Sequence, residues 1–316
     1  MSARSIIWVP GQKPKPPPKL YREQLWRCLT KGVADIAPEV AADLRQSPDA
    51  FGLSAWNLLY YRTYRDINQD MPWINALLKK HTANARDVTE ATTWGRHFTW
   101  MLYHLFDSMH WAINWIPDPD IKAAMTESDR YFENHDGVAD RVRRLLKEDL
   151  RQALDLGRKV MLIGHSLGSV IAYDTLWELA HEDGYAPKID ALLTLGSPLG
   201  VKFIQKRLKG AREQGMKRYP HNIHRWFNIA AMGELRAIDR ILRKDFSPML
   251  EMGLVESIED CAYGVFNYYR DENGLNVHRS YGYLVNSVTA GIISDWWAGR
   301  VDPAGPSKAR RSTAKC

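Results

Sequence analysis

Residues 160–169 have the sequence Val-Met-Leu-Ile-Gly-His-Ser-Leu-Gly-Ser, which contains the pattern Gly-x-Ser-x-Gly. The pattern lies between an apolar run at 159–163, typical of a strand, and a helical pattern at 169–179. A serine on so sharp a turn is pushed out of the C-terminal edge of a sheet, and glycines beside it avoid collisions with neighbouring backbone. We therefore predict that Ser166 is a nucleophile at a helix N-terminus, the alternative being a glycine-rich turn with a buried serine.

Strand and helix patterns alternate on both sides of this motif. Helical spacing covers 21–33, and an amphipathic pattern covers 137–156 and ends at Gly157, where a C-terminal cap belongs. Apolar and β-branched runs predict further strands at 5–9, 54–61, 189–195, 226–231 and 265–269. This alternation predicts an α/β fold with a mostly parallel central sheet and helices on both faces.

The composition is that of an ordinary soluble protein. The chain has 316 residues, of which 45% are hydrophobic and 25% charged, with a mean hydropathy of -0.40. No apolar run approaches the roughly 18–20 residues that cross a bilayer, and the N-terminus lacks the pattern of a secretory signal. The three cysteines are too few and too scattered for a disulfide framework or a zinc site. We expect a cytoplasmic protein with one domain at 1–298.

The formal net charge of +6 is concentrated at the C-terminus. Residues 299–316 hold five Lys or Arg residues and one Asp, a net +4 that leaves only +2 for the rest of the chain. We expect this basic segment to be a disordered, solvated tail, the alternative being a docking arm for a membrane or a nucleic acid. No nucleic-acid or nucleotide motif is present, so we expect no nucleic-acid partner, whereas transient contact with a membrane surface stays open.

A segment at about 64–135 is rich in aromatic residues and predicts a helical insertion or lid. From 94 to 109 its apolar residues recur at helical intervals. It could form a wall or lid over an apolar acyl pocket, or a helical subdomain that buries its tryptophans in its own core. Its histidines lack metal-ligand spacing. It contains five of the twelve tryptophans: Trp73, Trp94, Trp100, Trp111 and Trp115.

The nucleophile motif together with Leu195-Gly-Ser-Pro-Leu199 resembles the α/β-hydrolase superfamily, in particular its lipase-like serine esterases. The resemblance covers about 158–297, together with the first strand and the turn at 9–11, whereas 20–150 show none. It implies an α/β-hydrolase fold and a catalytic triad in the order Ser, acid, His.

His278 is the histidine that the resemblance assigns to the triad. It follows the last predicted strand, and 278–284 is similar to the His-x-Ser-Tyr pattern of these proteins at the entry to a C-terminal helix. His221 and His224 precede a predicted strand, so we interpret them as surface or structural residues.

The acid is assigned from the strand at Trp226-Phe-Asn228, which is similar to the strand whose end carries the family's carboxylate. Glu234 lies nearest that strand end and is our predicted acid. Asp239 is the alternative acid, although it could also cap a helix.

Acyl transfer also needs backbone N–H groups directed at the developing oxyanion. The resemblance assigns these donors to Leu167, directly after the nucleophile, and to Gln12, after the turn that follows the first strand. Pro10 stands in that turn where the family usually has histidine. No metal and no organic cofactor are expected.

These residues predict a serine hydrolase that cleaves a small-molecule or lipid carboxylic ester through an acyl-enzyme. An acyltransferase or thioesterase with the same triad is one alternative, and a non-catalytic scaffold with this fold is another. The acyl chain, the alcohol and the oligomeric state are left open.

Overall fold

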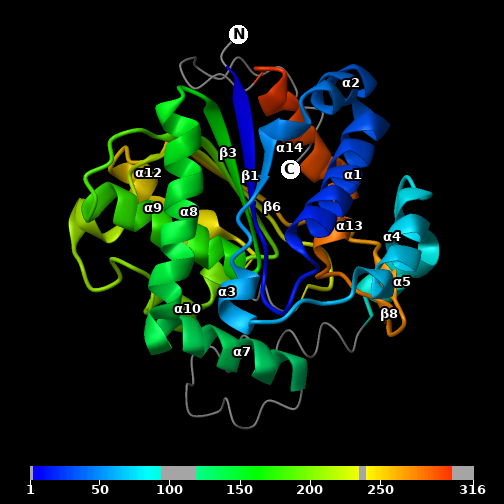
Figure 1. Cartoon of the computed structure of the whole chain (residues 1–316), viewed down its shortest axis with the longest axis horizontal. Helices are drawn as coiled ribbons and strands as arrows, with labels where there is room; N and C mark the ends of the chain where they lie inside the picture. Colours follow the sequence, from blue (N-terminus) through cyan, green and yellow to red (C-terminus); the bar gives the residue numbers. More distant parts are fainter. Residues whose placement is uncertain (1–2, 94–118, 235–239, 301–316) are drawn as a thin grey trace.

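A computed structural model describes residues 3–93, 119–234 and 240–300 (Figure 1). Its central sheet has six strands, all parallel, in the order β2-β1-β3-β4-β5-β6. The predicted α/β class with a parallel sheet is therefore confirmed. The strands are β1 (Arg4–Val9), β2 (Phe51–Leu53), β3 (Lys159–His165), β4 (Ile189–Leu195), β5 (Ile223–Ile229) and β6 (Ser257–Cys261). A separate antiparallel pair joins β7 (Arg270–Asp271) and β8 (Gly274–Leu275).

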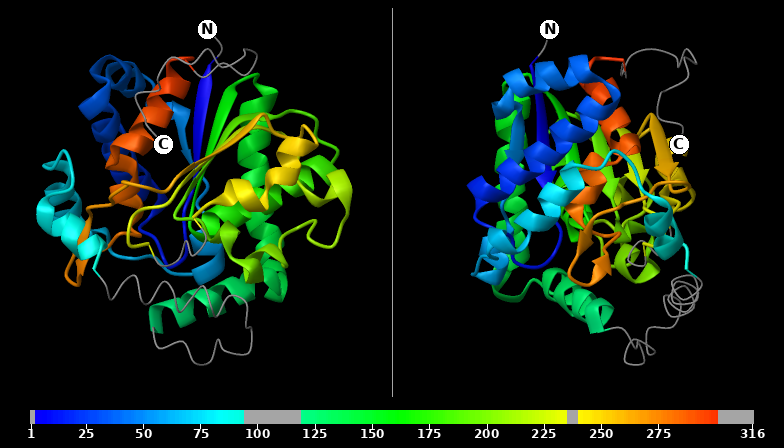
Figure 2. Two further views of the ribbon diagram at one scale, coloured as in Figure 1. Left: turned by 180° about the vertical axis from the view of Figure 1, so that it is seen from behind. Right: turned by 90° about the vertical axis from the view of Figure 1, so that its right-hand side faces the viewer.

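Helices cover both faces of the sheet. The buried strands are nearly continuous apolar runs, and their successive side chains point to opposite faces, so both faces need a cover. In β1, Ile6 and Trp8 enter one core and Ile7 and Val9 enter the other. Figures 1 and 2 show the helical layers on the two sides of the sheet. The first core includes α1 (Pro18–Ile36), α2 (Pro38–Gln46), α4 (Met71–Leu78), α13 (Ser280–Val285) and α14 (Ser287–Trp297). The second includes α3 (Asn57–Tyr61), α8 (Val138–Asp155), α9 (Leu167–His181), α10 (Lys202–Gln205), α11 (Leu242–Asp245) and α12 (Ser247–Glu251).

The prediction of a strand at 265–269 is wrong. The last strand of the sheet is β6, which sequence reading missed because Glu259 and Asp260 interrupt its apolar pattern. This edge strand places Asp260 where its carboxylate accepts hydrogen bonds from the backbone N–H of Leu242 and Arg243. The apolar segment 265–269 is instead an irregular stretch whose side chains are largely buried.

The prediction of a strand at 54–61 is also wrong. The strand β2 ends before it, and the segment turns into the short helix α3. Its aromatic side chains suggested a strand, but they pack against each other, with the rings of Trp56 and Tyr60 5.4 Å apart. Tertiary packing therefore overrides the β propensity of these residues.

Part of the predicted insertion at about 64–135 is described, and it is helical. It contains α4, α5 (Ala85–Ala91) and α7 (Pro119–Phe132), and Trp73 is partly buried against the first core. The other four tryptophans of the insertion, and the tail from 301 onward, lie outside the described residues. Within the described parts of the chain, no helix has both the length and the apolar character needed to span a membrane.

The sheet topology defines where a ligand can bind. The chain runs from β1 to β2 on one side and then returns to place β3 on the other side of β1. In open parallel sheets, such a reversal leaves a crevice at the carboxyl ends of the two strands. The turn after β1 and the turn after β3 therefore lie together at this point, beside the loops that follow β4 and β5.

We predict that Gly32→Ala destabilises the fold. Gly32 lies in α1 against α13, and a Cβ there would lie 2.5 Å from the carbonyl oxygen of Leu284 and 2.9 Å from the Cα of Val285. This crowding should cost about 1–3 kcal/mol in the free energy of unfolding, measured by denaturant titration, although alanine is the better helix former. Glu23→Ala, at an exposed position of the same helix, should change stability by less than about 0.5 kcal/mol. Equal stability of the two variants would contradict the close packing of α1 on α13.

Candidate active site

The turn between β3 and α9 holds Ser166 in a strained backbone conformation, with φ 54° and ψ -128°. Neighbouring backbone crowds this turn, so that only glycine fits two positions before and two positions after the serine. A Cβ on Gly164 would lie 2.6 Å from the Cα of Ser169, and a Cβ on Gly168 would lie 2.3 Å from the carbonyl oxygen of Val9. The structure therefore has the sharp strand-to-helix turn that the sequence predicts around Ser166.

Ser166, His278 and Glu234 form one continuous chain of hydrogen bonds. The Oγ of Ser166 lies 3.0 Å from Nε2 of His278, and Nδ1 of the same ring lies 2.6 Å from Oε2 of Glu234. Glu234 follows β5 and is 1% exposed, whereas the His278 side chain, just before α13, is 15% exposed. The structure thus brings together the three side chains that the sequence proposed as nucleophile, base and acid.

A buried tyrosine supports the carboxylate. The hydroxyl of Tyr283, in α13, donates a hydrogen bond to Oε2 of Glu234 at 3.4 Å and accepts one from the backbone N–H of Ala231 at 3.1 Å. Burial, reinforced by the nearby Glu234 carboxylate, holds the pKa of Tyr283 well above its ordinary value. Tyr283 therefore keeps its proton and remains a donor to the acid.

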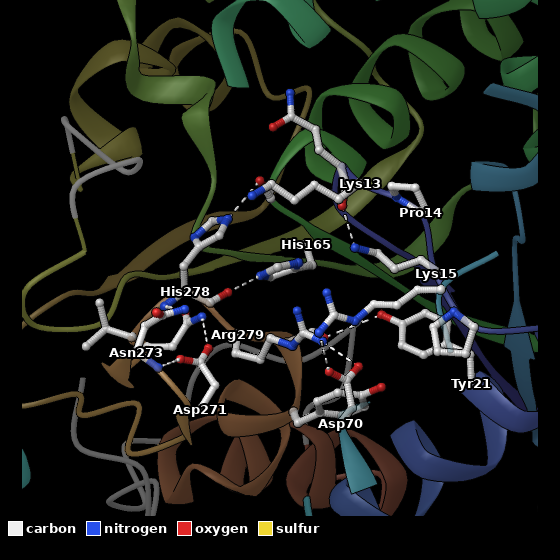
Figure 3. Close-up of a pocket in the computed structure, with 18 of the residues that line it drawn as sticks. Lys13, Pro14, Lys15, Tyr21, Asp70, His165, Asp271, Asn273, His278 and Arg279 are labelled. Carbon is white, nitrogen blue, oxygen red and sulfur yellow. Dashed lines mark hydrogen bonds and ion pairs between the residues drawn. The ribbon is translucent and has the colours of Figure 1, made fainter. Parts of the chain in front are cut away.

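A second histidine holds the main chain at His278. Nε2 of His165 donates a hydrogen bond to the carbonyl oxygen of His278 at 2.8 Å, and the two rings lie 4.9 Å apart (Figure 3). The side-chain oxygen of Asn276 accepts a hydrogen bond from the His278 N–H at 3.3 Å. His165 is a site residue that we did not predict, although its position inside the motif, directly before Ser166, was the available signal.

The turn after β1 lies directly against the nucleophile. A Cβ on Gly11 would lie 2.8 Å from the Cβ of Ser166, so glycine is required for this approach. Side chains at the start of α3 fix the turn: Nε1 of Trp56 donates to the carbonyl oxygen of Pro10 at 2.8 Å, and Nδ2 of Asn57 donates to that of Gly11 at 2.9 Å. Pro10 is compatible with this geometry, because its carbonyl is the group used.

The two residues proposed as oxyanion-hole donors flank this contact. Leu167 is the first residue of α9, so its N–H has no partner within the helix. Gln12 follows Gly11 and lines the same cavity as Ser166. Its side chain donates a hydrogen bond to Oγ of Ser128 in α7, at 2.9 Å, which ties the described end of the insertion to this turn.

A cavity of about 650 Å³ opens onto Ser166 and His278. An apolar acyl pocket under the tryptophan-rich insertion was one of our two alternatives for that segment, but residues 94–118, with four of its five tryptophans, lie outside the described residues. The described lining has polar and apolar surface in about equal parts, and its apolar part comes from prolines, Leu275, Val277 and the rings of Tyr21 and Tyr281. The charged residues that line it are Lys13, Lys15, Arg65, Asp70, Glu234, Asp271 and Arg279.

Of the remaining candidates, the structure describes His221 and His224, both of them in contacts away from Ser166. Asp239, the alternative acid, lies outside the described residues. His224 belongs to the start of β5, at the opposite end of the strand from Glu234, and its Nδ1 lies 2.8 Å from Oε1 of Glu256. His221 packs its ring against that of His181, with 5.0 Å between the centroids.

We compared the chain with known proteins. Neither the family models, nor the curated proteins, nor the solved structures gave a match. The interpretation of the site therefore depends on its own geometry and on the motifs in the sequence.

We predict that Tyr283→Phe lowers stability, because it leaves the buried N–H of Ala231 without its acceptor. The free energy of unfolding should fall by about 1–3 kcal/mol in denaturant titrations. Tyr268→Phe is a matched control, because the hydroxyl of Tyr268 makes only a long 3.5 Å hydrogen bond, to the carbonyl of Val285. A Tyr283→Phe protein no less stable than the control would show that this hydroxyl does not hold the acid loop.

Proposed function

We propose that this protein is a serine hydrolase that cleaves carboxylic ester bonds. The observation that carries the proposal is the hydrogen-bonded chain from Ser166 Oγ through the His278 imidazole to the Glu234 carboxylate. Nucleophile, base and orienting acid within hydrogen-bond reach of one another define this type of site, whatever the fold that carries them. The crowded turn that places Ser166 in the lining of the cavity at the strand ends adds to the support.

The proposed reaction begins with attack on the ester carbonyl. As the oxygen of Ser166 bonds to the carbonyl carbon, His278 takes the serine proton on Nε2, and Glu234 stabilises the resulting imidazolium through Nδ1. His278 then gives that proton to the departing alkoxide, which leaves an ester between the acyl group and Ser166. A water molecule, deprotonated by the same imidazole, attacks this acyl-enzyme and releases the carboxylic acid.

The negative charge that develops on the carbonyl oxygen needs fixed donors. The backbone N–H groups of Leu167 and Gln12 are our candidates, since both lie beside Ser166 on turns held by tight packing. The α9 N-terminus adds a favourable partial positive charge at the same place. The parallel sheet and its C-terminal site are compatible with an α/β-hydrolase, and we include that fold in the proposal.

Substitutions in the triad test this function directly. Ser166→Ala and His278→Ala should lower kcat for p-nitrophenyl esters by at least about 10³-fold, because each removes a group that acts on the reacting atoms. Glu234→Gln should lower it by about 10²- to 10⁴-fold, since the amide no longer stabilises the imidazolium. The measurement is initial-rate hydrolysis across a series of acyl chain lengths, which also gives the size of the acyl pocket.

His224→Ala is the matched histidine control, and it should retain the activity of the wild type, since His224 lies at the other end of the sheet. Hydrolysis that persists in Ser166→Ala, or that is lost equally in His224→Ala, would contradict the assignment of the triad. Transfer of the acyl group to an added alcohol in preference to water would identify an acyltransferase that uses the same residues.

A further inference from the structure

We infer that the part of the cavity beside Lys15 binds a carboxylate of the substrate, so that the preferred ester is the half-ester of a short dicarboxylic acid. This inference rests on the proposed ester hydrolysis and specifies its substrate class. It follows from the charges around the cavity, from the hydrogen bond of Lys15 and from the position of that bond relative to Ser166.

The ammonium group of Lys15 lies at the cavity without direct contact to a carboxylate of the described residues. Among the described residues, its ammonium donates one hydrogen bond, to the carbonyl oxygen of Gln12, and forms no ion pair. The side chain is partly buried and lines the cavity. A partly desolvated ammonium with unused donors is costly unless an anion completes its coordination.

Two arginines on the same side of the cavity share a single carboxylate. Asp70, which is 2% exposed, accepts a hydrogen bond from Nη2 of Arg279 and lies 3.2 Å from Nη2 of Arg65. Figure 3 shows Lys15 and Arg279 directed toward the same part of the cavity, with Asp70 against Arg279. Among the described lining residues on this side, Asp70 can offset only one of the two guanidinium charges, so Lys15 adds to a positive excess there. The Glu127 carboxylate, which is not part of the lining, also acts on Lys15.

The other acidic residues of the lining are engaged elsewhere. Glu234 is hydrogen-bonded to His278. The carboxylate of Asp271 accepts hydrogen bonds from the backbone N–H of Asn273 and from the side-chain amide of Asn276. The described lining therefore has four basic side chains and three acidic ones. A single added negative charge balances them, which favours a monoanionic carboxylate over a phosphate dianion.

The electrostatic surroundings of Lys15 agree with this assignment. Burial, and next the charge of Arg279, lowers the pKa of Lys15 to about 7, and Lys13 adds a smaller repulsion. The carboxylates of Asp70 and Glu127 act in the opposite direction. Only the protonated form attracts a carboxylate, so the preference for an anionic ester should be strong below pH 7 and should fade as the pH rises above it.

The hydrogen bond of Lys15 also indicates where the carboxylate lies. Its acceptor, the Gln12 carbonyl, belongs to the residue whose N–H we assign to the oxyanion hole. A group held by Lys15 is therefore only a few bonds from the ester carbonyl attacked by Ser166. This placement favours a short dicarboxylic half-ester over an ester with a charge at the far end of a long acyl chain.

The test compares methyl hydrogen succinate with methyl 4-methylpentanoate, a neutral ester in which an isopropyl group replaces the carboxylate. For the wild type at pH 6, we expect kcat/KM for the anionic ester to exceed that for the neutral ester by at least about 10-fold. A hydrogen bond to a charged group has about this effect. Lys15→Met should lower this ratio by about 10-fold or more. The ratio should also fall between pH 6 and pH 8 in the wild type and stay flat in Lys15→Met.

Lys19→Met is the matched control, because Lys19 is an exposed lysine in the same proline-rich segment at 13–19. The kcat/KM ratio of this variant should equal that of the wild type. Arg65→Met should lower the ratio less than Lys15→Met does, and turnover of the neutral ester shows that each variant is folded. Turnover of the neutral ester with a wild-type ratio near 1, unchanged by Lys15→Met, would overturn the carboxylate site but leave the ester hydrolase standing. Turnover of p-nitrophenyl esters without turnover of either methyl ester would overturn the carboxylate site alone. Absence of turnover for every ester tested would overturn the proposed function, and the inference with it.

Discussion

Close packing of backbone against backbone at the turn after β3 is the constraint on which the rest of the site depends. Gly168 lets α9 begin in contact with the end of β1, where any Cβ would lie 2.3 Å from the Val9 carbonyl oxygen. Gly11 makes the reciprocal approach possible from the β1 turn toward Ser166. The strained backbone of the serine persists because this packing surrounds it. One contact between two strand ends thus positions both the nucleophile and the turn proposed to stabilise the oxyanion.

The other two residues of the proposed triad reach the serine through a second set of constraints. Tyr283 connects α13 to the loop after β5, because its hydroxyl contacts both the Glu234 carboxylate and the backbone of Ala231. His165 holds the main chain of His278 in a similar way, through a hydrogen bond to its carbonyl oxygen. The acid and the base are therefore positioned by the helix and the loops that carry them, and the His278 ring completes the chain of hydrogen bonds.

Sequence alone could predict what is encoded locally. The turn around Ser166 and strands such as 189–195 depend on short-range patterns, so both were found. The strand at 257–261 was missed because an edge strand tolerates polar residues, and 265–269 was misassigned because a buried irregular segment has the same apolar composition. Glu234 was predicted from its place after a strand, but the contacts that hold its carboxylate come from residues more than forty positions away, which no local pattern encodes. No local pattern in the sequence singles out Lys15, because its place in the cavity depends on contacts between distant parts of the chain.

The central claim is that Ser166 is a nucleophile activated by His278. It is tested most directly by intact-protein and peptide mass spectrometry after treatment with a fluorophosphonate, which forms a stable adduct only with an activated serine. We expect one adduct per chain, located on Ser166, absent from Ser166→Ala and formed far more slowly in His278→Ala. A folded wild-type protein that takes up no label, or labels equally well without His278, would contradict this claim.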